Sequence, residues 1–228
     1  MSLERIEGAV KRGYDSTRRQ AQAQRTRTDV LEAARGLLLE RGYAATSMAD
    51  VAAAAAVSVE TVYKAFGNKA GLVRAVAERA LEGAGPVPAE TRSDALQALE
   101  RDPRALLRGW GLLTAEVAPR IAPILLLVRA GATHDAELAS LADQLAASRH
   151  QRMADNARRL DERGHLRTTV DVGEATDVLW TYSSPELYEL LVLRRGWDLE
   201  RYSGFVTDGL IAHLLPMPDA DGTSTSDS

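Results

Sequence analysis

Apolar residues between positions 28 and 79 recur at the spacing of short amphipathic helices. Val30, Leu31, Ala34, Leu37 and Leu38 follow one another at intervals that predict one buried helical face. A basic residue and a glycine come next, at positions 41 and 42, a combination typical of a helix C-terminus. We therefore expect a first helix that ends at about residue 41.

A second helix is predicted to begin near residue 47. Either Thr46 or Ser47 can supply its N-cap. With Ser47 as the cap, Asp50 falls three residues later, as in a capping box with aspartate in the place of glutamate. The predicted buried side of this helix consists of Met48, Val51, Ala52 and Ala55.

A third helix is predicted from Val59 to Phe66, with Ser58 as its N-cap. The residues expected to point inward are Val59, Val62 and Phe66. The residues expected to point outward are Thr61, Tyr63 and Lys64. Two helices joined by so short a turn form a helix-turn-helix, whose second helix enters the major groove of DNA.

The same stretch resembles the N-terminal domain of the TetR family of transcriptional regulators, over roughly residues 28–75. The resemblance is carried by Gly42–Tyr43, Thr46, Val51–Ala52, Val57–Ser58, Thr61–Val62–Tyr63, Phe66 and Lys69. Two positions depart from the family pattern, because Ala56 and Glu60 stand where members often carry glycine. A left-handed backbone at Ala56 would cost about 1 kcal/mol or less. The Glu60 carboxylate would repel phosphate but could accept a hydrogen bond from cytosine N4.

The resemblance also implies a set of DNA contacts. Residues expected to contact phosphates are Thr46, Tyr63 and Lys69. The rest of the implied DNA-binding surface is Ser58, Val59, Glu60, Thr61 and Lys64, the last four nearest to base edges. Because Lys69 follows a possible cap, Asn68, its ammonium and the helix amides could meet one phosphate together. From the residues alone, Tyr63 could instead be a packing aromatic and Lys69 a solvated charge.

Charge is distributed unevenly along the chain. Residues 1–80 contain 13 Lys or Arg and 9 Asp or Glu, a net charge of +4, whereas residues 81–228 contain 15 and 23, a net charge of −8. Basic residues interleaved with glutamines precede the first helix without a hydrophobic period. We expect residues 1–25 to form a basic flexible arm, which is either a disordered tail or a segment that orders along the minor groove. Either form adds salt-dependent affinity for DNA.

The composition favours an all-α protein, because aromatic residues make up only 5% and alternating β-branched runs are nearly absent. The chain contains no cysteine, which rules out disulfides and thiolate metal sites. We find no signal peptide, and the longest apolar candidate for a membrane span, residues 121–128, is interrupted by Pro123. A cytoplasmic location is the default expectation.

Nothing in the sequence indicates catalysis. The four histidines, at positions 134, 150, 165 and 213, lack metal-ligand spacing. The segment Ser183–Ser184–Pro185 lacks the glycines of a nucleophile elbow, and there is no glycine-rich phosphate loop. We therefore expect no enzymatic activity, no metal site and no cofactor.

The remainder of the chain is predicted to be helical. We expect a helix-turn-helix domain over residues 26–72, a helical ligand-binding and dimerisation domain over 73–216, and a disordered tail over 217–228. Proline positions predict separate helices at 103–117 and 121–130. The later predicted helices span 135–163, 174–193 (one kinked helix or two consecutive ones) and 198–215.

The resemblance extends more weakly into this second domain, where it implies that two C-terminal helices of each subunit form a four-helix dimer interface. The predicted interface residues, which could alternatively fill the core of one subunit, are Leu179, Leu187, Leu190, Leu191, Phe205, Val206, Leu210 and Leu214. A ligand cavity with apolar walls and a few polar groups is expected in the same domain. Its candidate lining residues are Trp110, Leu113, Thr114, Ile124, Leu127, Val128, Met153, Asn156, Trp180 and Tyr182.

Together these expectations describe a dimeric transcriptional repressor. It would bind a palindromic operator in double-stranded DNA through the helix-turn-helix, and a small-molecule effector in the second domain would release it. The alternative is a small-molecule binding or interaction protein that retains the module without specific DNA binding.

Overall fold

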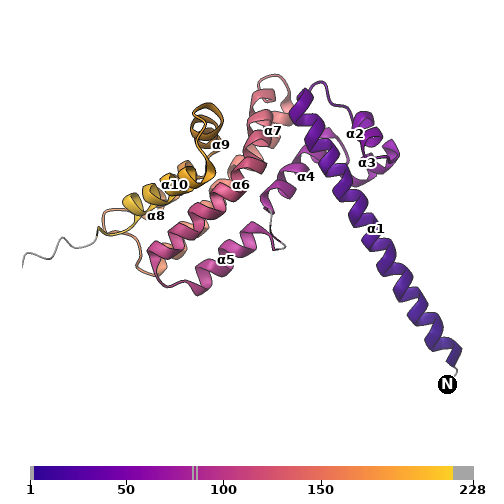
Figure 1. Ribbon diagram of the computed structural model, residues 1–228, viewed down its shortest axis with the longest axis horizontal. Coiled ribbons are helices and arrows are strands. Elements are labelled where there is room, and N and C mark those ends of the chain that lie inside the picture. Colours follow the sequence, from indigo (N-terminus) through magenta and orange to yellow (C-terminus); the bar gives the residue numbers. More distant parts are fainter. Residues whose placement is uncertain (1–2, 84, 86, 218–228) are drawn as a thin grey trace, which may run out of the picture. The chain divides into compact units, whose positions relative to one another are not determined.

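A computed structural model of the protein describes residues 3–83, 85 and 87–217, with side chains described from residue 20 onward. All regular elements in this part of the chain are helices, which confirms the all-α prediction (Figure 1). They are α1 (Leu3–Arg41), α2 (Met48–Ala54), α3 (Val59–Phe66), α4 (Lys69–Leu81), α5 (Ala89–Leu99), α6 (Pro103–Gly131), α7 (Ala136–Glu162), α8 (Val172–Tyr182), α9 (Pro185–Tyr188), the π-helix η1 (Glu189–Arg194) and α10 (Leu199–Leu214). The predicted tail lies, apart from Met217, outside the described residues.

The chain folds as two compact units. The N-terminal unit comprises Met1–Ala80 and Leu127–Leu141, and the C-terminal unit comprises Leu81–Leu126 and Ala142–Ser228. The sequence predicted contiguous domains, whereas the structure assigns the end of α6 and the beginning of α7 to the N-terminal unit. The reason is that apolar residues of this helical hairpin, Val128 and Leu138, are buried.

Helix α1 is longer than the sequence predicted. It begins at Leu3, so the expected flexible arm over residues 1–25 is helical from Leu3 onward. The segment is rich in Arg, Gln and Ala, which are strong helix formers and can continue a helix without a buried face. The sequence did not indicate this helix because hydrophobic periodicity reports the burial of a helix and not the conformation of its backbone.

The core of the N-terminal unit is built from the apolar faces that the sequence predicted. On α1 the buried residues are Val30, Leu31, Ala34 and Leu38, and on α2 they are Met48, Val51 and Ala52. Val62 of α3 is fully buried, and α4 contributes Leu72, Val73 and Val76. The helix-turn-helix is therefore held by a hydrophobic core of its own unit.

Helix α6 is one continuous helix of 29 residues, where the sequence predicted two. Pro119 and Pro123 lie inside it, and each removes one helical N–H donor. Ala118, Ile121 and Ala122 around them are buried, and this packing offsets the lost hydrogen bonds. Helix α6 is long and apolar enough to cross a membrane, although the sequence predicted no membrane span. The core helix of a globular protein meets the same criteria of length and composition. Several α6 residues belong to the hydrophobic core of the C-terminal unit.

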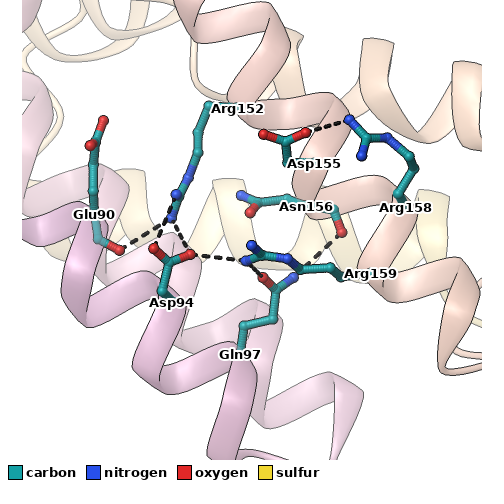
Figure 2. A network of polar contacts seen from close by, with 8 residues as sticks. All are labelled: Glu90, Asp94, Gln97, Arg152, Asp155, Asn156, Arg158 and Arg159. Carbon is teal, nitrogen blue, oxygen red and sulfur yellow. Dashed lines mark hydrogen bonds and ion pairs between the residues drawn. The ribbon is translucent and has the colours of Figure 1, made fainter.

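Two arginines of α7 bind α5 within the C-terminal unit. Figure 2 shows Arg152 and Arg159 converging on the Asp94 carboxylate, each with a shortest N–O distance of 2.9 Å. Arg152 also donates to the main-chain oxygen of Glu90 (3.1 Å), and Arg159 donates to Gln97 Oε1 (2.8 Å). Burial opposes ionisation of Asp94, but the hydrogen bonds from the two guanidinium groups outweigh it and hold its pKa below the usual value. The single Asp94 carboxylate is therefore paired with two guanidinium groups.

The C-terminal helices begin at side-chain caps. Asp171 accepts a hydrogen bond from Glu174 N (2.8 Å) at α8, and Asp198 accepts one from Arg201 N (2.8 Å) at α10. Ser184 caps α9, so the stretch from 174 to 193 consists of consecutive helices separated at Ser183 and Ser184. These caps fix where each helix starts and therefore which residues face the core.

Candidate nucleic-acid interface and ligand cavity

Helix α2 begins with a complete capping box. Ser47 Oγ accepts a hydrogen bond from Asp50 N (3.1 Å), and Asp50 Oδ2 accepts one from Ser47 N (2.9 Å). This confirms Ser47 as the cap and Asp50 as its partner. Hydrogen bonds from the side chain and main chain of Ser47 lower the pKa of Asp50, so the carboxylate stays ionised and the box stays closed at neutral pH.

The turn between α2 and α3 places Ala56 in the left-handed region. Its φ is 52°, and no other non-glycine residue in the described part of the chain has a positive φ. Val57 N donates to Ala52 O (3.0 Å) and Ala56 N donates to Ala53 O (3.2 Å), which is the hydrogen-bond pattern of a Schellman motif. Glycine is the usual residue at this position because a Cβ there is strained. The departure at Ala56 therefore stores strain in the turn.

Helix α3 presents a mostly polar face to solvent. Ser58 caps it by accepting a hydrogen bond from Thr61 N (3.2 Å). Val62 is buried as predicted, but Val59, which was expected to point inward, is 37% exposed because it occupies the first position of this short helix. Tyr63 is 50% exposed, which argues against a packing role for its ring. The exposed residues are Val59, Glu60, Thr61, Tyr63, Lys64 and Ala65.

Thr46 does not form part of this surface, and its predicted phosphate contact is corrected. Its side chain is only 3% exposed. Its hydroxyl lies within hydrogen-bond distance of Gly42 O (2.8 Å) and Leu37 O (3.2 Å), and its N–H donates to Tyr43 O (3.2 Å). The Thr46 hydroxyl therefore faces main-chain carbonyl groups near the end of α1 and is not available to a phosphate.

Lys69 is held at the beginning of α4. Asn68 Oδ1 accepts a hydrogen bond from Gly71 N (2.8 Å), which supports the predicted capping role of Asn68. The ammonium Nζ of Lys69 lies 4.0 Å from the centre of the Tyr43 ring, a cation–π contact. Burial lowers the pKa of Lys69, although Asp135 and Asp50 act in the opposite direction. Lys69 is therefore not a freely solvated charge, and its phosphate contact stays a prediction.

The C-terminal unit contains a cavity of about 240 Å³. Six of the predicted ligand-binding residues line it, namely Trp110, Leu113, Thr114, Met153, Asn156 and Tyr182. The other four do not. Ile124 is fully buried, and Leu127 and Val128 belong to the N-terminal unit. Trp180 does not line the cavity but contacts Arg149, whose guanidinium carbon is 4.7 Å from the centre of the Trp180 ring.

The cavity is lined by polar and by apolar residues, and these two sets are called its polar wall and its apolar wall. The polar wall comes from α5 and α7 and consists of Glu90, Ser93, Ser148, Arg149, Arg152 and Asn156. Residues of α6, including Trp110, Val117 and Ile121, form much of the apolar wall. The sequence reasoning missed most of the polar wall, although the lining residues of α7 recur at 145, 148, 149, 152, 153 and 156, the spacing of one helical face. A search for a helical face that mixes polar and apolar residues could have found these lining residues of α7.

Arg149 is the partly buried cation of this wall. Its Nη1 donates to Trp180 O and to Ser183 Oγ (3.1 Å), and its guanidinium stacks on the Trp180 ring. Burial lowers its pKa, and the charge of Glu186 opposes this effect. Two other lining residues carry buried polar atoms that make no hydrogen bond to described parts of the protein, Trp110 Nε1 and Asn156 Oδ1.

The residues predicted to form a dimer interface divide into two groups. Leu179, Val206, Leu210 and Leu214 are buried inside the C-terminal unit, so they cannot form a surface that a partner covers, and their assignment is corrected. The physical reason is that α8 and α10 pack these faces against their own core. The remaining four are partly buried or exposed, namely Leu187, Leu190, Leu191 and Phe205. For them the interface stays a prediction.

A three-helix unit in which a capped, exposed third helix follows a tight turn defines the class of helix-turn-helix DNA-binding proteins. The family model for bacterial regulatory proteins of the tetR family matches residues 30–76. The HTH-type transcriptional regulator AlkX of Mycobacterium tuberculosis is 45% identical over 53 residues, which cover 23% of this chain. The match spans 25% of that relative's length.

Two solved structures share the fold over most of the chain. NalD, the secondary repressor of the MexAB-OprM multidrug efflux pump in Pseudomonas aeruginosa, is 24% identical with a TM-score of 0.65, and the match covers 85% of this chain and 98% of NalD. The SmeT–triclosan complex is 22% identical with a TM-score of 0.66, covering 84% and 92%. Residues 30–76 therefore form a helix-turn-helix domain of the TetR type, and the two solved structures share the fold of most of the chain.

Proposed function

We propose that the protein is a homodimeric repressor in the cytoplasm, which binds a palindromic DNA operator through α3 of each subunit and is released by a small molecule. The observation that carries the proposal is the exposed face of α3, which the Ser47 capping box and the Ser58 cap hold on a hydrophobic core. An exposed polar helix fixed in this way is the element that reads the major groove in helix-turn-helix proteins.

The roles of the α3 residues follow from their chemistry. The exposed Tyr63 hydroxyl is suited to a phosphate, which positions the helix without reading sequence. Lys64 and Thr61 are exposed one turn apart and can reach base edges. Glu60 is also exposed and favours an operator with a cytosine at the facing position, because a carboxylate accepts from cytosine N4.

Dimerisation is proposed through the last helices of the C-terminal unit. Leu190 and Leu193 of η1 are each 53% exposed, and Phe205 of α10 is 40% exposed. Large apolar side chains that gather at a surface are typical of protein interfaces. A dimer with two-fold symmetry can bind two half-sites in successive major grooves, about 34 Å apart.

Release by a ligand is supported by the cavity. It has apolar and polar walls, and the unpaired Trp110 Nε1 and Asn156 Oδ1 could find partners in a polar ligand after small shifts. A ligand lowers the affinity for DNA only to the extent that it binds more tightly to the conformation that binds DNA poorly. The two similar structures, a repressor and a protein bound to triclosan, are consistent with such a role.

The decisive experiment is a footprint on the DNA that flanks the gene of this protein. We expect a protected palindrome whose half-sites lie about one helical turn of DNA, or a multiple of it, apart. The exposed Glu60 in α3 favours the alternative, a binding protein that has lost specific DNA recognition, because a carboxylate repels phosphate. Equal affinity for the flanking DNA and for shuffled duplexes would establish that alternative.

The oligomeric state is a separate test. Light scattering on the purified protein should give twice the chain mass of 24.6 kDa. The Leu190→Asp variant should shift this equilibrium towards the monomer because it places a charge in an apolar interface. Leu99→Asp is the matched control, since Leu99 is 81% exposed at the end of α5. An equal effect of both variants would contradict the assigned surface.

A further inference from the structure

We propose that the cavity selects small amphipathic acids and that Arg149 binds their acidic group. This inference rests on the proposed function, because it names the ligand class of the same cavity. It is carried by the composition of the lining, because charged and polar groups of α5 and α7 border the same cavity as apolar residues of α6. A ligand that matches both walls must itself have one polar end and one apolar end.

The charges on the polar wall favour an anion over a cation. Arg152 and Arg159 share the single Asp94 carboxylate (Figure 2), so these three side chains together carry one excess positive charge. Arg149 adds a further positive charge on the cavity side of α7, and both of its recorded hydrogen bonds go to neutral acceptors, Trp180 O and Ser183 Oγ. Glu186 also acts on Arg149 and offsets part of this charge.

Glu90, the acidic residue of the polar wall, does not cancel the preference of the cavity for an anion. Glu90 contacts Arg152 through its main-chain oxygen, and Figure 2 shows its carboxylate pointing away from the Arg152 guanidinium. The Glu90 residue is also exposed, so that water screens its charge. A ligand anion near Arg149 therefore gains from the guanidinium groups more than it loses to Glu90.

Arg149 is suited to bind a carboxylate while it keeps its present contacts. A guanidinium has five N–H donors, and both recorded hydrogen bonds of Arg149 leave from Nη1. Its stacking on Trp180 fixes the plane of the group, which lowers the entropy lost when a planar anion binds. A hydrogen bond between two charged groups in a partly buried site is stronger than one between neutral groups.

The size of the cavity limits the apolar part of the ligand. About 240 Å³ is below the range of roughly 300–1,000 Å³ that holds drug-sized ligands. The apolar wall from α6 offers Val117, Ile121 and Leu125 as contacts for a hydrocarbon chain or a single ring. Octanoate, octan-1-ol and octylamine are suitable probes because they share one chain and differ in the charge of the polar end.

Binding of the three probes to the full-length protein can be followed by tryptophan fluorescence, because Trp110 lines the cavity and Trp180 stacks on Arg149. We expect octanoate to bind at least about tenfold more tightly than octan-1-ol, and octylamine to bind most weakly. In Arg149→Met the ratio between octanoate and octan-1-ol should fall to about one. In the control Arg158→Met the ratio should be unchanged, because Arg158 is exposed on α7, pairs with Asp155 and does not line the cavity.

The measured quantity is the ratio of the affinities for octanoate and octan-1-ol within one variant. A ratio is needed because Arg149→Met also removes two hydrogen bonds at the end of α8 and can weaken the fold. Should that variant fail to fold, the order of the three probes on the unmodified protein still decides. Tighter or equal binding of octan-1-ol overturns the inference but leaves a ligand-binding cavity. Failure of all three probes to bind overturns it as well, whereas the proposed DNA binding is judged separately by the footprint, which needs no ligand.

Discussion

Replacing Ala56 by glycine should stabilise the protein, although it removes a side chain. Ala56 sits in the left-handed region with φ 52°, at the position of a Schellman motif where glycine is usual. Its side chain is exposed, so removal of the methyl group sacrifices little apolar burial. The change therefore acts almost entirely on backbone strain and on the entropy of the unfolded chain.

The magnitude is the difference between two terms. A non-glycine residue in the left-handed region costs about 1–2 kcal/mol relative to glycine. Glycine in turn loses more backbone entropy on folding, which costs about 0.5–1 kcal/mol relative to alanine. The expected net gain is about 0.5–1 kcal/mol in the free energy of unfolding, which corresponds to a rise in Tm of about 1–4 °C for a chain of this length.

Chemical denaturation followed by circular dichroism is the appropriate assay, with Ala56→Gly compared against Ala53→Gly. Ala53 is exposed like Ala56 but lies inside α2. Glycine in a helix interior is destabilising by about 0.5–1 kcal/mol, so the two substitutions should have opposite signs. Should Ala56→Gly destabilise the protein as much as Ala53→Gly does, the left-handed turn between α2 and α3 would be refuted.

Three further substitutions test the roles of neighbouring residues. Thr46→Val should cost about 1–3 kcal/mol of stability, because Gly42 O loses its buried hydroxyl donor, and should leave the DNA affinity of the folded protein unchanged in an anisotropy titration. Tyr63→Phe should weaken operator and non-operator DNA alike by about 0.5–1.5 kcal/mol at low salt, and unchanged affinity would remove Tyr63 from the phosphate contacts. Gly71→Ala should cost about 1–3 kcal/mol in a thermal melt, because the new Cβ would lie 2.2 Å from Phe66 O; full stability would contradict this close approach of α3 and α4.

The helix-turn-helix could be predicted from the sequence because its determinants are local. The Ser47 capping box and the Ser58 cap each depend on residues three positions apart, and the buried faces of α1 to α3 follow from helical spacing. Even the strain at Ala56 could be anticipated, since a single turn position decides it. Thr46 was misassigned because its burial depends on carbonyl groups of α1 that the local pattern does not reveal.

Predictions that depend on long-range packing were less successful. The pattern broke α6 at its prolines, whereas the core around Pro119 and Pro123 keeps it continuous. Leucines of η1 and α10 look alike in the sequence, yet Leu210 of α10 is buried in its own subunit while Leu190 of η1 is exposed. Helical spacing identifies an apolar face but does not say whether the same chain or a partner covers it.

The sequence by itself determined the all-α class, the helix-turn-helix and the positions of α3 and its caps, because short-range hydrogen bonds and helical periodicity encode them. Only the tertiary structure decided which α7 residues meet α5, α6 and α8 around one cavity. The Arg149 guanidinium and the Trp180 oxygen that it binds are 31 residues apart in the chain. Their contact exists only because packing of the whole unit brings the two helices together, and no local pattern carries that information.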